Sequence, residues 1–287
     1  MLWLILSVFS GLFQSIRDLF SKKELQSLDE YVVTFSMLFF SLPFLLPLLF
    51  FTEIPNLDVT FWFLVLAIGC LFSTASILYL KAIKISPLSL SVPMLAFTPL
   101  LLLITSPLML GEFPSSLGLI GVLLIVAGIY TLSIKDVREG YLAPFRALIK
   151  EKGPLIMLFV AVLFSIGANL IKIGIQQSSP LIFPAILNAS TSALLLPVML
   201  IKTKKAAEKI RNNFVVLFII GLFGGLMSIC AQNAMQLHIV PYVISVKRTN
   251  IIFSTSYGYL FFKEKRMMER FTGAIIMFFG ILLISFS

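Results

Sequence analysis

The sequence contains few of the residues on which enzymes and metal proteins rely. Only 12% of its 287 residues are charged, it has a single histidine, and its two cysteines, Cys70 and Cys230, lie far apart. No CxxC pair, HExxH motif, phosphate-binding loop or nucleophile–base motif occurs. We therefore predict no catalytic residues, no metal site and no cofactor, and the chain is not expected to be an enzyme or to drive transport with ATP by itself.

Hydrophobic residues instead make up 59% of the chain, and the mean hydropathy is +1.04. This composition is typical of membrane proteins and exceeds what a soluble core requires. The net charge of +9 does not indicate a nucleic-acid partner, because the basic residues lie in short loops between apolar runs. The first apolar segment lacks a basic leader and a cleavage site, so it is predicted to be retained as a membrane helix.

Ten apolar runs are long enough for a membrane-spanning helix, which needs about 20 residues. We therefore expect an all-α integral membrane protein that contacts the lipid bilayer along its length. The predicted spans are residues 2–20, 31–51, 60–80, 86–108, 115–134, 154–175, 180–201, 213–236, 240–262 and 268–286.

The second half of the chain repeats the first in a weak but consistent register. A shift of 152 residues places two glycines and a glutamate on the same residue types: Gly121, Gly128 and Glu112 on Gly273, Gly280 and Glu264. A shift of 155 residues aligns Phe9, Ser10, Gln14, Ile16 and Arg17 with Phe164, Ser165, Asn169, Ile171 and Lys172. Five crossings per repeat require the second copy to enter from the opposite face, so the pair is predicted to be inverted, with the substrate site between the halves.

The distribution of basic residues predicts the orientation. All but three of the 22 Lys and Arg residues fall in or beside the loops after the odd-numbered segments, and the exceptions are Lys172, Lys247 and Arg248. The positive-inside rule then places these loops in the cytoplasm and both termini outside.

Lys247 and Arg248 are adjacent cations inside the ninth apolar run. A cation at the bilayer centre costs about 2.5–3.5 kcal/mol on insertion scales, so the pair must face water, a partner or a ligand. The corresponding part of the fourth segment, around Pro93 to Ala96, is apolar, which favours a ligand-binding role over a role in the fold. Snorkelling or pairing with backbone carbonyls is the structural alternative.

Further candidates for substrate binding lie at helical spacing from this pair or in neighbouring segments. Asn250 and Tyr257 share a stripe with Lys247, whereas Gln232 is in the eighth segment and Lys172 in the sixth. Lys172 falls in the same half of the membrane as Lys247, so the cations are expected to converge on one cavity. The alternative for the polar residues is a role in helix packing.

Acidic side chains are expected only near segment ends, at positions such as Asp18, Glu112 and Glu264. A proton-coupled exporter of cations normally has a carboxylate within the membrane that exchanges a proton for substrate. That mechanism is therefore disfavoured.

The five-plus-five arrangement, with an LGE motif (Leu110 to Glu112) and a KE motif (Lys263, Glu264) before glycine-patterned last helices, resembles the drug/metabolite transporter superfamily, of the type with two EamA-like domains. The resemblance implies one domain at 1–140, a cytoplasmic linker at 141–153 and a second domain at 154–287. The adjacent Lys247 and Arg248 are similar to the phosphate-binding basic pair of triose-phosphate and sugar-phosphate translocators.

These observations predict a secondary transporter that alternates its access to the two sides and carries a small anionic, phosphorylated metabolite in a cell membrane. An exporter of amino acids or other neutral metabolites, or a lipid-phosphate flippase, stays open as an alternative. A homodimer also stays open, because the sequence does not fix the oligomeric state.

Overall fold

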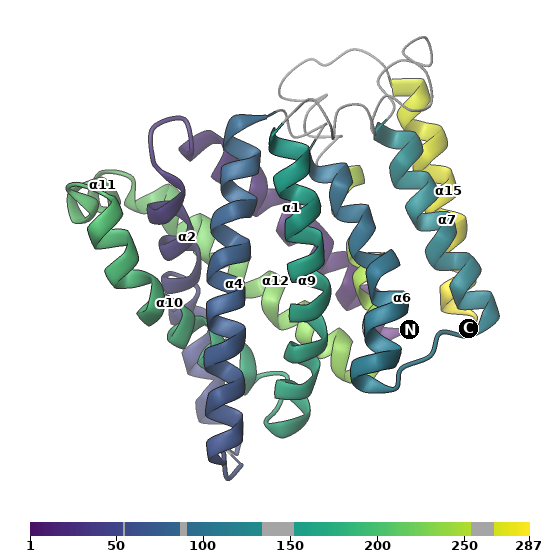
Figure 1. Ribbon diagram of the computed structural model, residues 1–287, viewed down its shortest axis with the longest axis horizontal. Helices are drawn as coiled ribbons and strands as arrows, with labels where there is room; N and C mark the ends of the chain where they lie inside the picture. Colours follow the sequence, from purple (N-terminus) through teal and green to yellow (C-terminus); the bar gives the residue numbers. More distant parts are fainter. Residues whose placement is uncertain (54, 87–90, 134–151, 254–266) are drawn as a thin grey trace.

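The fold is known from a computed structural model that describes all residues except 54, 87–90, 134–151 and 254–266 (Figure 1). Every regular element in the described ranges is a helix. Within these ranges, six helical spans are long and apolar enough to cross a membrane, and shorter apolar helices pack beside them. The prediction of an all-helical membrane protein is confirmed.

The first half of the chain forms the first repeat and the second half the second. Elements of the first half are α1 (Leu2–Glu24), α2 (Glu30–Phe39), α3 (Leu42–Leu45), η1 (Leu46–Phe51), α4 (Val59–Ile85), η2 (Val92–Ala96), α6 (Phe97–Leu110) and α7 (Ser116–Ser133). Those of the second are α9 (Lys152–Gln177), α10 (Ile182–Lys202), α11 (Ala206–Asn212), α12 (Phe214–Leu237), α13 (Val240–Lys247) and α15 (Met267–Ser285).

Two predicted spans of the first repeat are interrupted helices. The span at 31–51 divides into α2, α3 and the 3-10 helix η1, and the two later pieces each have a proline in their first two positions, Pro43 and Pro47. The span at 86–108 divides into the 3-10 helix η2 and the α-helix α6. Proline lacks the N–H that a continuing helix would use, so the chain restarts its hydrogen bonding at these points.

The contacts between helices confirm the inverted repeat. Helix α1 packs on α12, and their counterparts α9 and α4 pack on each other; α1 also packs on α13, as α9 packs on α6. Likewise α2 packs on α12 and α10 on α4, while α7 packs on its own counterpart α15. Each repeat therefore buries its helices mainly against the other repeat, and the space between the halves lies at the centre of the bundle.

Helices α7 and α15 cross through glycines related by the repeat. A methyl group on Gly121 would lie 2.7 Å from the Gly280 carbonyl oxygen, and one on Gly280 would lie 2.7 Å from that of Gly121. A methyl group on Gly128 would lie at the same distance from the Gly273 carbonyl oxygen. Small residues allow the two backbones to touch, as is common between membrane helices. The glycine register in the sequence therefore marks the seam between the two last helices.

Gly121→Ala is expected to destabilise the protein by about 1–3 kcal/mol, because the new methyl group meets backbone that cannot rotate away. Thermal unfolding in detergent measures the effect. Gly224→Ala is the control, because its methyl group would make only an ordinary contact of 3.4 Å with Met37. Equal melting temperatures for the two variants would contradict the account of the seam.

Asp29 links the repeats at one end of the bundle, here called the Asp29 end. Its carboxylate caps α2 by accepting from the Val32 N–H at 3.0 Å, and also accepts from Thr203 at 2.7 Å and Lys209 at 3.1 Å. Burial favours the neutral acid, but the hydrogen bonds from Thr203, Val32 and Lys209 outweigh it, so the pKa of Asp29 is lowered. The carboxylate therefore stabilises the fold in its ionised form.

Asp29→Ala is expected to cost about 1–2 kcal/mol at pH 7, because both the helix cap and the link to the second repeat are lost. Since the folded-state pKa is lowered, the wild-type advantage is present above the unfolded value of about 3.9 and is lost as the pH falls through the folded-state value. Melting temperatures of both proteins between pH 3 and 8 measure it. Asp29→Asn, which keeps a capping oxygen, is expected to lose less stability than Asp29→Ala. If the difference in melting temperature between wild type and Asp29→Ala widened in acid, the stabilising role of the ionised carboxylate would be contradicted.

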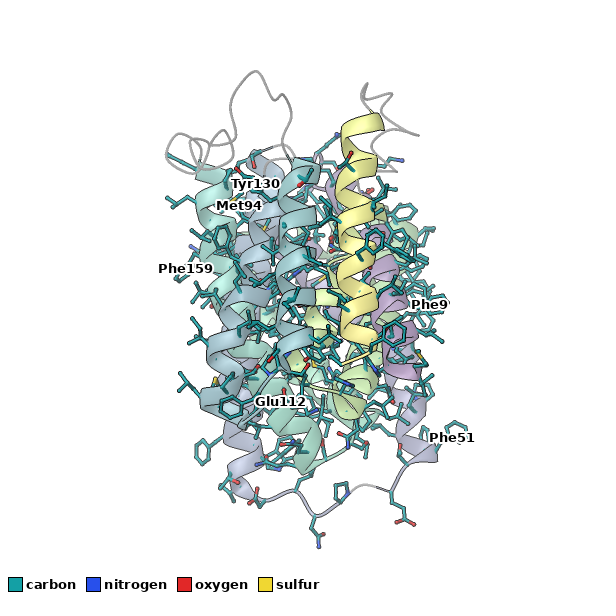
Figure 2. All side chains as sticks on the ribbon, turned by 90° about the vertical axis from the view of Figure 1, so that its right-hand side faces the viewer. Phe9, Phe51, Met94, Glu112, Tyr130 and Phe159 are labelled. Carbon is teal, nitrogen blue, oxygen red and sulfur yellow. The ribbon has the colours of Figure 1, made fainter. Side chains whose placement is uncertain are left out.

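The opposite end of the bundle, here called the Glu112 end, carries the short α6–α7 connection and the N-terminus (Figure 1). Large apolar side chains cover the outer surface between the two ends, and examples are Phe9 at 46% exposed and Phe159 at 54% (Figure 2). Such a surface is stable in contact with lipid chains.

Candidate functional site

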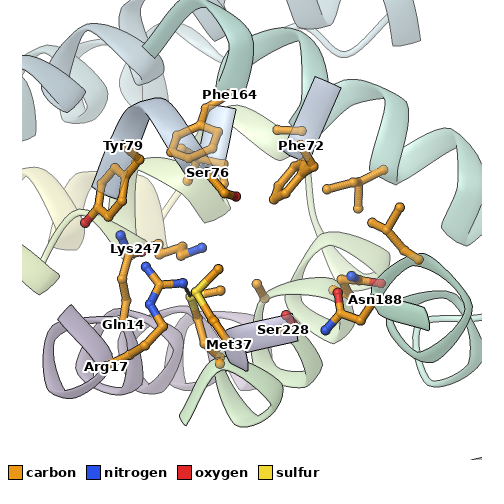
Figure 3. A pocket seen from close by; sticks show the side chains of 18 of the residues that line it. Gln14, Arg17, Met37, Phe72, Ser76, Tyr79, Phe164, Asn188, Ser228 and Lys247 are labelled. Carbon is orange, nitrogen blue, oxygen red and sulfur yellow. Dashed lines mark hydrogen bonds between the residues drawn. The ribbon is translucent and has the colours of Figure 1, made fainter. Parts of the chain in front are cut away.

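A cavity of about 120 Å³ lies between the two repeats (Figure 3). Its wall is shared, because α1, α2, α4 and α6 contribute from the first repeat and α9, α10, α12 and α13 from the second. More than half of the lining residues are apolar. The polar ones are Gln14, Arg17, Ser76, Tyr79, Thr98, Asn188, Ser228, Gln232, Lys247 and Arg248.

Lys247 and Arg248 line this cavity at a break in the ninth span. Helix α13 ends at Lys247, Arg248 and Thr249 form a turn, and residues 250–253 are helical again. The Arg248 N–H bonds to the carbonyl oxygens of Ile244 at 3.2 Å and Ser245 at 3.1 Å, a tightening typical of a helix end. In the first repeat, the junction of η2 and α6 lies at the corresponding position. Broken helices at matching places in inverted repeats mark the binding site in many transporters.

Helix α1 approaches this break at a glycine. A methyl group on Gly11 would lie 2.7 Å from the Lys247 carbonyl oxygen and 2.9 Å from the Thr249 hydroxyl. Only a residue without a side chain lets α1 lie against the exposed backbone of the turn. This packing sets the rotation of α1 and brings its residues Gln14 and Arg17 to the same cavity.

The basic pair has no carboxylate partner in the described part of the chain. Lys247 is half-buried with no hydrogen bond or ion pair there, and Arg248 is only 3% exposed with its Nε unpaired. Two cations side by side at the C-terminus of α13 gain some stabilisation from the helix dipole. That gain is smaller than the stabilisation from a counter-ion. The positive charge of the site therefore favours the binding of an anion.

Arg17 is a third cation on the cavity, and its charge is balanced. Its guanidinium donates to Asp18 Oδ1 at 2.7 and 3.1 Å, and Asp18 Oδ2 accepts from the Tyr79 hydroxyl at 2.6 Å. The guanidinium also lies 5.9 Å from the centre of the Tyr79 ring. Within the described ranges, the only hydrogen-bond acceptor of its Nη1 is the Met227 sulfur, at 3.4 Å. Thioether sulfur is a weak acceptor, so this nitrogen retains capacity for an anion's oxygen.

The expectation that acidic residues lie only at segment ends is wrong for Asp18. Helix α1 continues to Glu24, beyond the predicted end at residue 20, so Asp18 lies inside the helix and is 3% exposed. The reason is that Lys22 of the added turn donates to the carbonyl oxygens of Ile83 and Ser86. The carboxylate is held by Arg17 and Tyr79, so the cavity keeps an excess of positive charge.

Lys172 does not line the cavity. The prediction that Lys172 and Lys247 converge on one cavity is therefore wrong. Its ammonium donates to the carbonyl oxygens of Met235 and His238, the latter at 3.0 Å, and lies 3.5 Å from Glu112. Glu112 in turn accepts from the Val240 N–H at 2.7 Å. Lys172 therefore closes a link between the repeats at the Glu112 end.

Of the remaining predicted site residues, one lines the cavity, one lies outside its wall and one lies outside the described residues. Gln232 lines the cavity and is 5% exposed, and its Oε1 has no hydrogen-bond partner among the described residues. Asn250 is fully buried beside Gly11 and is not part of the cavity wall. Tyr257 lies outside the described residues. Sequence reasoning did not select Tyr79, which no repeat register or charge pattern distinguishes from other tyrosines.

The architecture agrees with comparisons to known proteins. The model of the EamA-like transporter family matches residues 1–134 and again residues 151–286. The chain belongs to the EamA-like transporter family. It is therefore a multi-pass membrane transporter, and the resemblance to the superfamily with two EamA-like domains is confirmed.

Solved structures share the fold of this EamA-like transporter. Twenty-eight chains from solved structures match it. One of them, described only as "Crystal structure of protein", has a TM-score of 0.75 at 13% identity, with 99% of this chain and 96% of that chain covered. At this identity the likeness establishes the fold alone. No curated protein matches the sequence.

Proposed function

We propose that this EamA-like transporter carries a small anionic, phosphorylated metabolite by alternating access, with the anion held in the cavity between the repeats. Lys247 and Arg248 bind the anion directly. Arg contributes a planar fork of donors and Lys a point charge, which together suit a phosphate group. Arg17, through Nη1, and Gln232 complete the site, whereas Lys172 has no part in it.

The observation that carries the proposal is the charge imbalance of the cavity wall. Three cations line the wall, and Asp18 behind it offsets only Arg17, while Lys247 and Arg248 stay unpaired in the described chain. Buried charges are normally paired, since leaving one unpaired costs several kcal/mol. An anion with a charge near −2, such as a phosphate monoester, would balance this site.

The links between the repeats support alternating access. Asp29 with Lys209 joins them at one end of the bundle, and Glu112 with Lys172 joins them at the other. Rocking one repeat against the other would open one link while the opposite link holds. The cavity lies between the two links, so a bound anion would become accessible from each side in turn.

The charge distribution supports a sidedness. The short helix α11 at the Asp29 end carries Lys209 and Arg211, and Lys22 and Lys84 lie at the same end. By the positive-inside rule this end faces the cytoplasm, and both termini face outward.

Ligand-induced thermal stabilisation tests the proposed function. Binding to the folded state raises the melting temperature by mass action. Purified protein is compared with glycerol 3-phosphate, inorganic phosphate, alanine and a phosphatidic acid in the same detergent. Stabilisation by the two soluble phosphates supports the proposal. Stabilisation by alanine alone would favour an amino-acid exporter, and by the lipid alone a flippase, and either result would overturn it.

A further inference from the structure

Two hydrogen-bond acceptors lie among the cations of the cavity wall. Gln14 of α1 and Gln232 of α12 both line the cavity, and they are only 4% and 5% exposed. The side-chain carbonyl oxygen of each, Oε1, is buried and has no hydrogen-bond donor among the described residues. Each repeat therefore contributes one unpaired acceptor to the site.

The neighbouring cations favour this orientation of an amide group. Gln14, Arg17 and Lys247 lie close together beside Tyr79 (Figure 3). A side-chain amide orients in the local field, and its negative oxygen is more stable near a cation than its N–H groups are. The Arg17 guanidinium itself donates to Asp18 and the Met227 sulfur. The amide oxygen therefore remains available to a ligand in the cavity.

Unpaired acceptors constrain what the cavity can bind. A buried acceptor without a donor costs about 1–3 kcal/mol, so a ligand that leaves both amide oxygens unpaired binds less tightly. The cations cannot fully remove this cost, because the oxygens of a bound anion compete for the same N–H groups. A ligand that carries its own donor therefore satisfies the wall most completely.

The hydroxyl groups of the wall impose no such requirement. The Thr98 hydroxyl is also buried and has no partner in the described part of the chain, but a hydroxyl group either donates or accepts. Ser76 and Ser228 line the cavity with the same freedom. An amide oxygen only accepts, so Gln14 and Gln232 are the residues that ask for a donor.

The size of the cavity keeps that donor close to the anionic group. Its volume is about 120 Å³. This is less than the roughly 150 Å³ of an apolar cavity that accommodates benzene. An oxyanion with an O–H group of its own, or with a hydroxyl group on a very short body, presents charge and donor together in such a space.

We propose that Gln14 and Gln232 make the site selective for phosphate-type anions that carry an O–H group, and against anions that offer only acceptors. This inference rests on the proposed function and narrows its substrate class. Inorganic phosphate keeps an O–H group at neutral and mildly alkaline pH. Sulfate has the same tetrahedral shape and a similar charge, but it has no O–H group and leaves the two amide oxygens without a hydrogen bond.

Isothermal titration of the purified full-length protein at pH 8 tests the selection with three probes: inorganic phosphate, sulfate and methyl phosphate. Methyl phosphate is a phosphate without a donor at this pH, because the second pKa of a phosphate ester is about 6. We expect inorganic phosphate to bind at least about tenfold more tightly than the other two, since only it supplies the missing hydrogen bond.

Two variants identify the source of the selection. Gln14→Met and Gln232→Met each remove one acceptor at similar side-chain volume. Each should reduce the preference for phosphate over sulfate by about three- to tenfold without lowering the melting temperature of the ligand-free protein, because a buried unpaired group is removed. Gln236→Met is the matched control: Gln236 lies one turn farther along α12 and is exposed, so the preference should not change.

The outcomes separate this inference from the proposed function. Equal affinities for inorganic phosphate and either probe without a donor would overturn the selection while leaving an anion site at Lys247 and Arg248. A preference for phosphate that survives in both glutamine variants would also overturn it, because the amide oxygens would then not be its source. No binding of inorganic phosphate or methyl phosphate would overturn both the inference and the proposed function.

Discussion

Lys247→Met is expected to raise the melting temperature of the ligand-free protein while weakening anion binding. The ammonium group is partly buried and unpaired within the described chain, so it opposes folding unless an anion is present. Removing it from a membrane interior should stabilise the empty protein by about 1–3 kcal/mol. The lost charge-assisted hydrogen bond should weaken anion binding by roughly 10- to 100-fold.

Melting temperature and anion affinity are also measured for Arg248→Gln, a second site variant, and for Lys204→Met, a control. Arg248→Gln should also weaken binding, since its guanidinium lines the cavity with Nε unpaired. Lys204 is exposed in the loop after α10, and Lys204→Met should alter neither stability nor binding. A Lys247→Met protein that melted lower than wild type would mean that the ammonium group is structural, which the account does not allow.

Lys172→Met is expected to have the opposite effect on stability, a loss of about 3–5 kcal/mol. Lys172 is paired with Glu112 and both side chains are largely buried, at 8% and 13% exposed. Removing the ammonium leaves the Glu112 carboxylate without its cation and the Met235 and His238 carbonyl groups without a donor. Breaking a buried pair from one side typically costs this much.

A double-mutant cycle with Glu112→Gln tests whether the Lys172–Glu112 ion pair causes this loss of stability. Glutamine keeps an oxygen for the Val240 N–H, so Glu112→Gln alone should cost less than Lys172→Met. In the double variant the losses should not add, because no unpaired carboxylate remains. Additive losses would contradict a direct interaction. Two lysines in apolar helices thus differ in role, one stabilising the fold and one serving the site.

Much of the fold follows from the sequence because two patterns leave few alternatives. Apolar runs of about 20 residues can only cross a membrane as helices, since lipid offers no hydrogen bonds to the backbone. The glycine register identified the α7–α15 seam because only glycine allows carbonyl contacts such as those of Gly121 and Gly280. The adjacent Lys247 and Arg248 predict a polar cavity, because two cations in an apolar run need one.

The partners of other charges could not be predicted, because they come from distant parts of the chain. The carbonyl groups that hold Lys172 lie at the end of α12, and its Glu112 belongs to the other repeat. The position of Asp18 depends on how far α1 continues, which packing against the end of α4 decides. Whether Arg17 faces the cavity depends on the rotation of α1 at Gly11. Helical spacing gives the face that residues share but not which neighbour that face meets.

Exchange in liposomes tests the central claim most directly. Wild-type protein is reconstituted into vesicles loaded with unlabelled phosphate, and uptake of radiolabelled phosphate is compared with uptake into vesicles without internal anion. Two unpaired cations disfavour an empty return step, so we predict rapid uptake only in the loaded vesicles, and none with Lys247→Met. Uptake of alanine instead of phosphate, undiminished in Lys247→Met, would contradict an anion site at the basic pair.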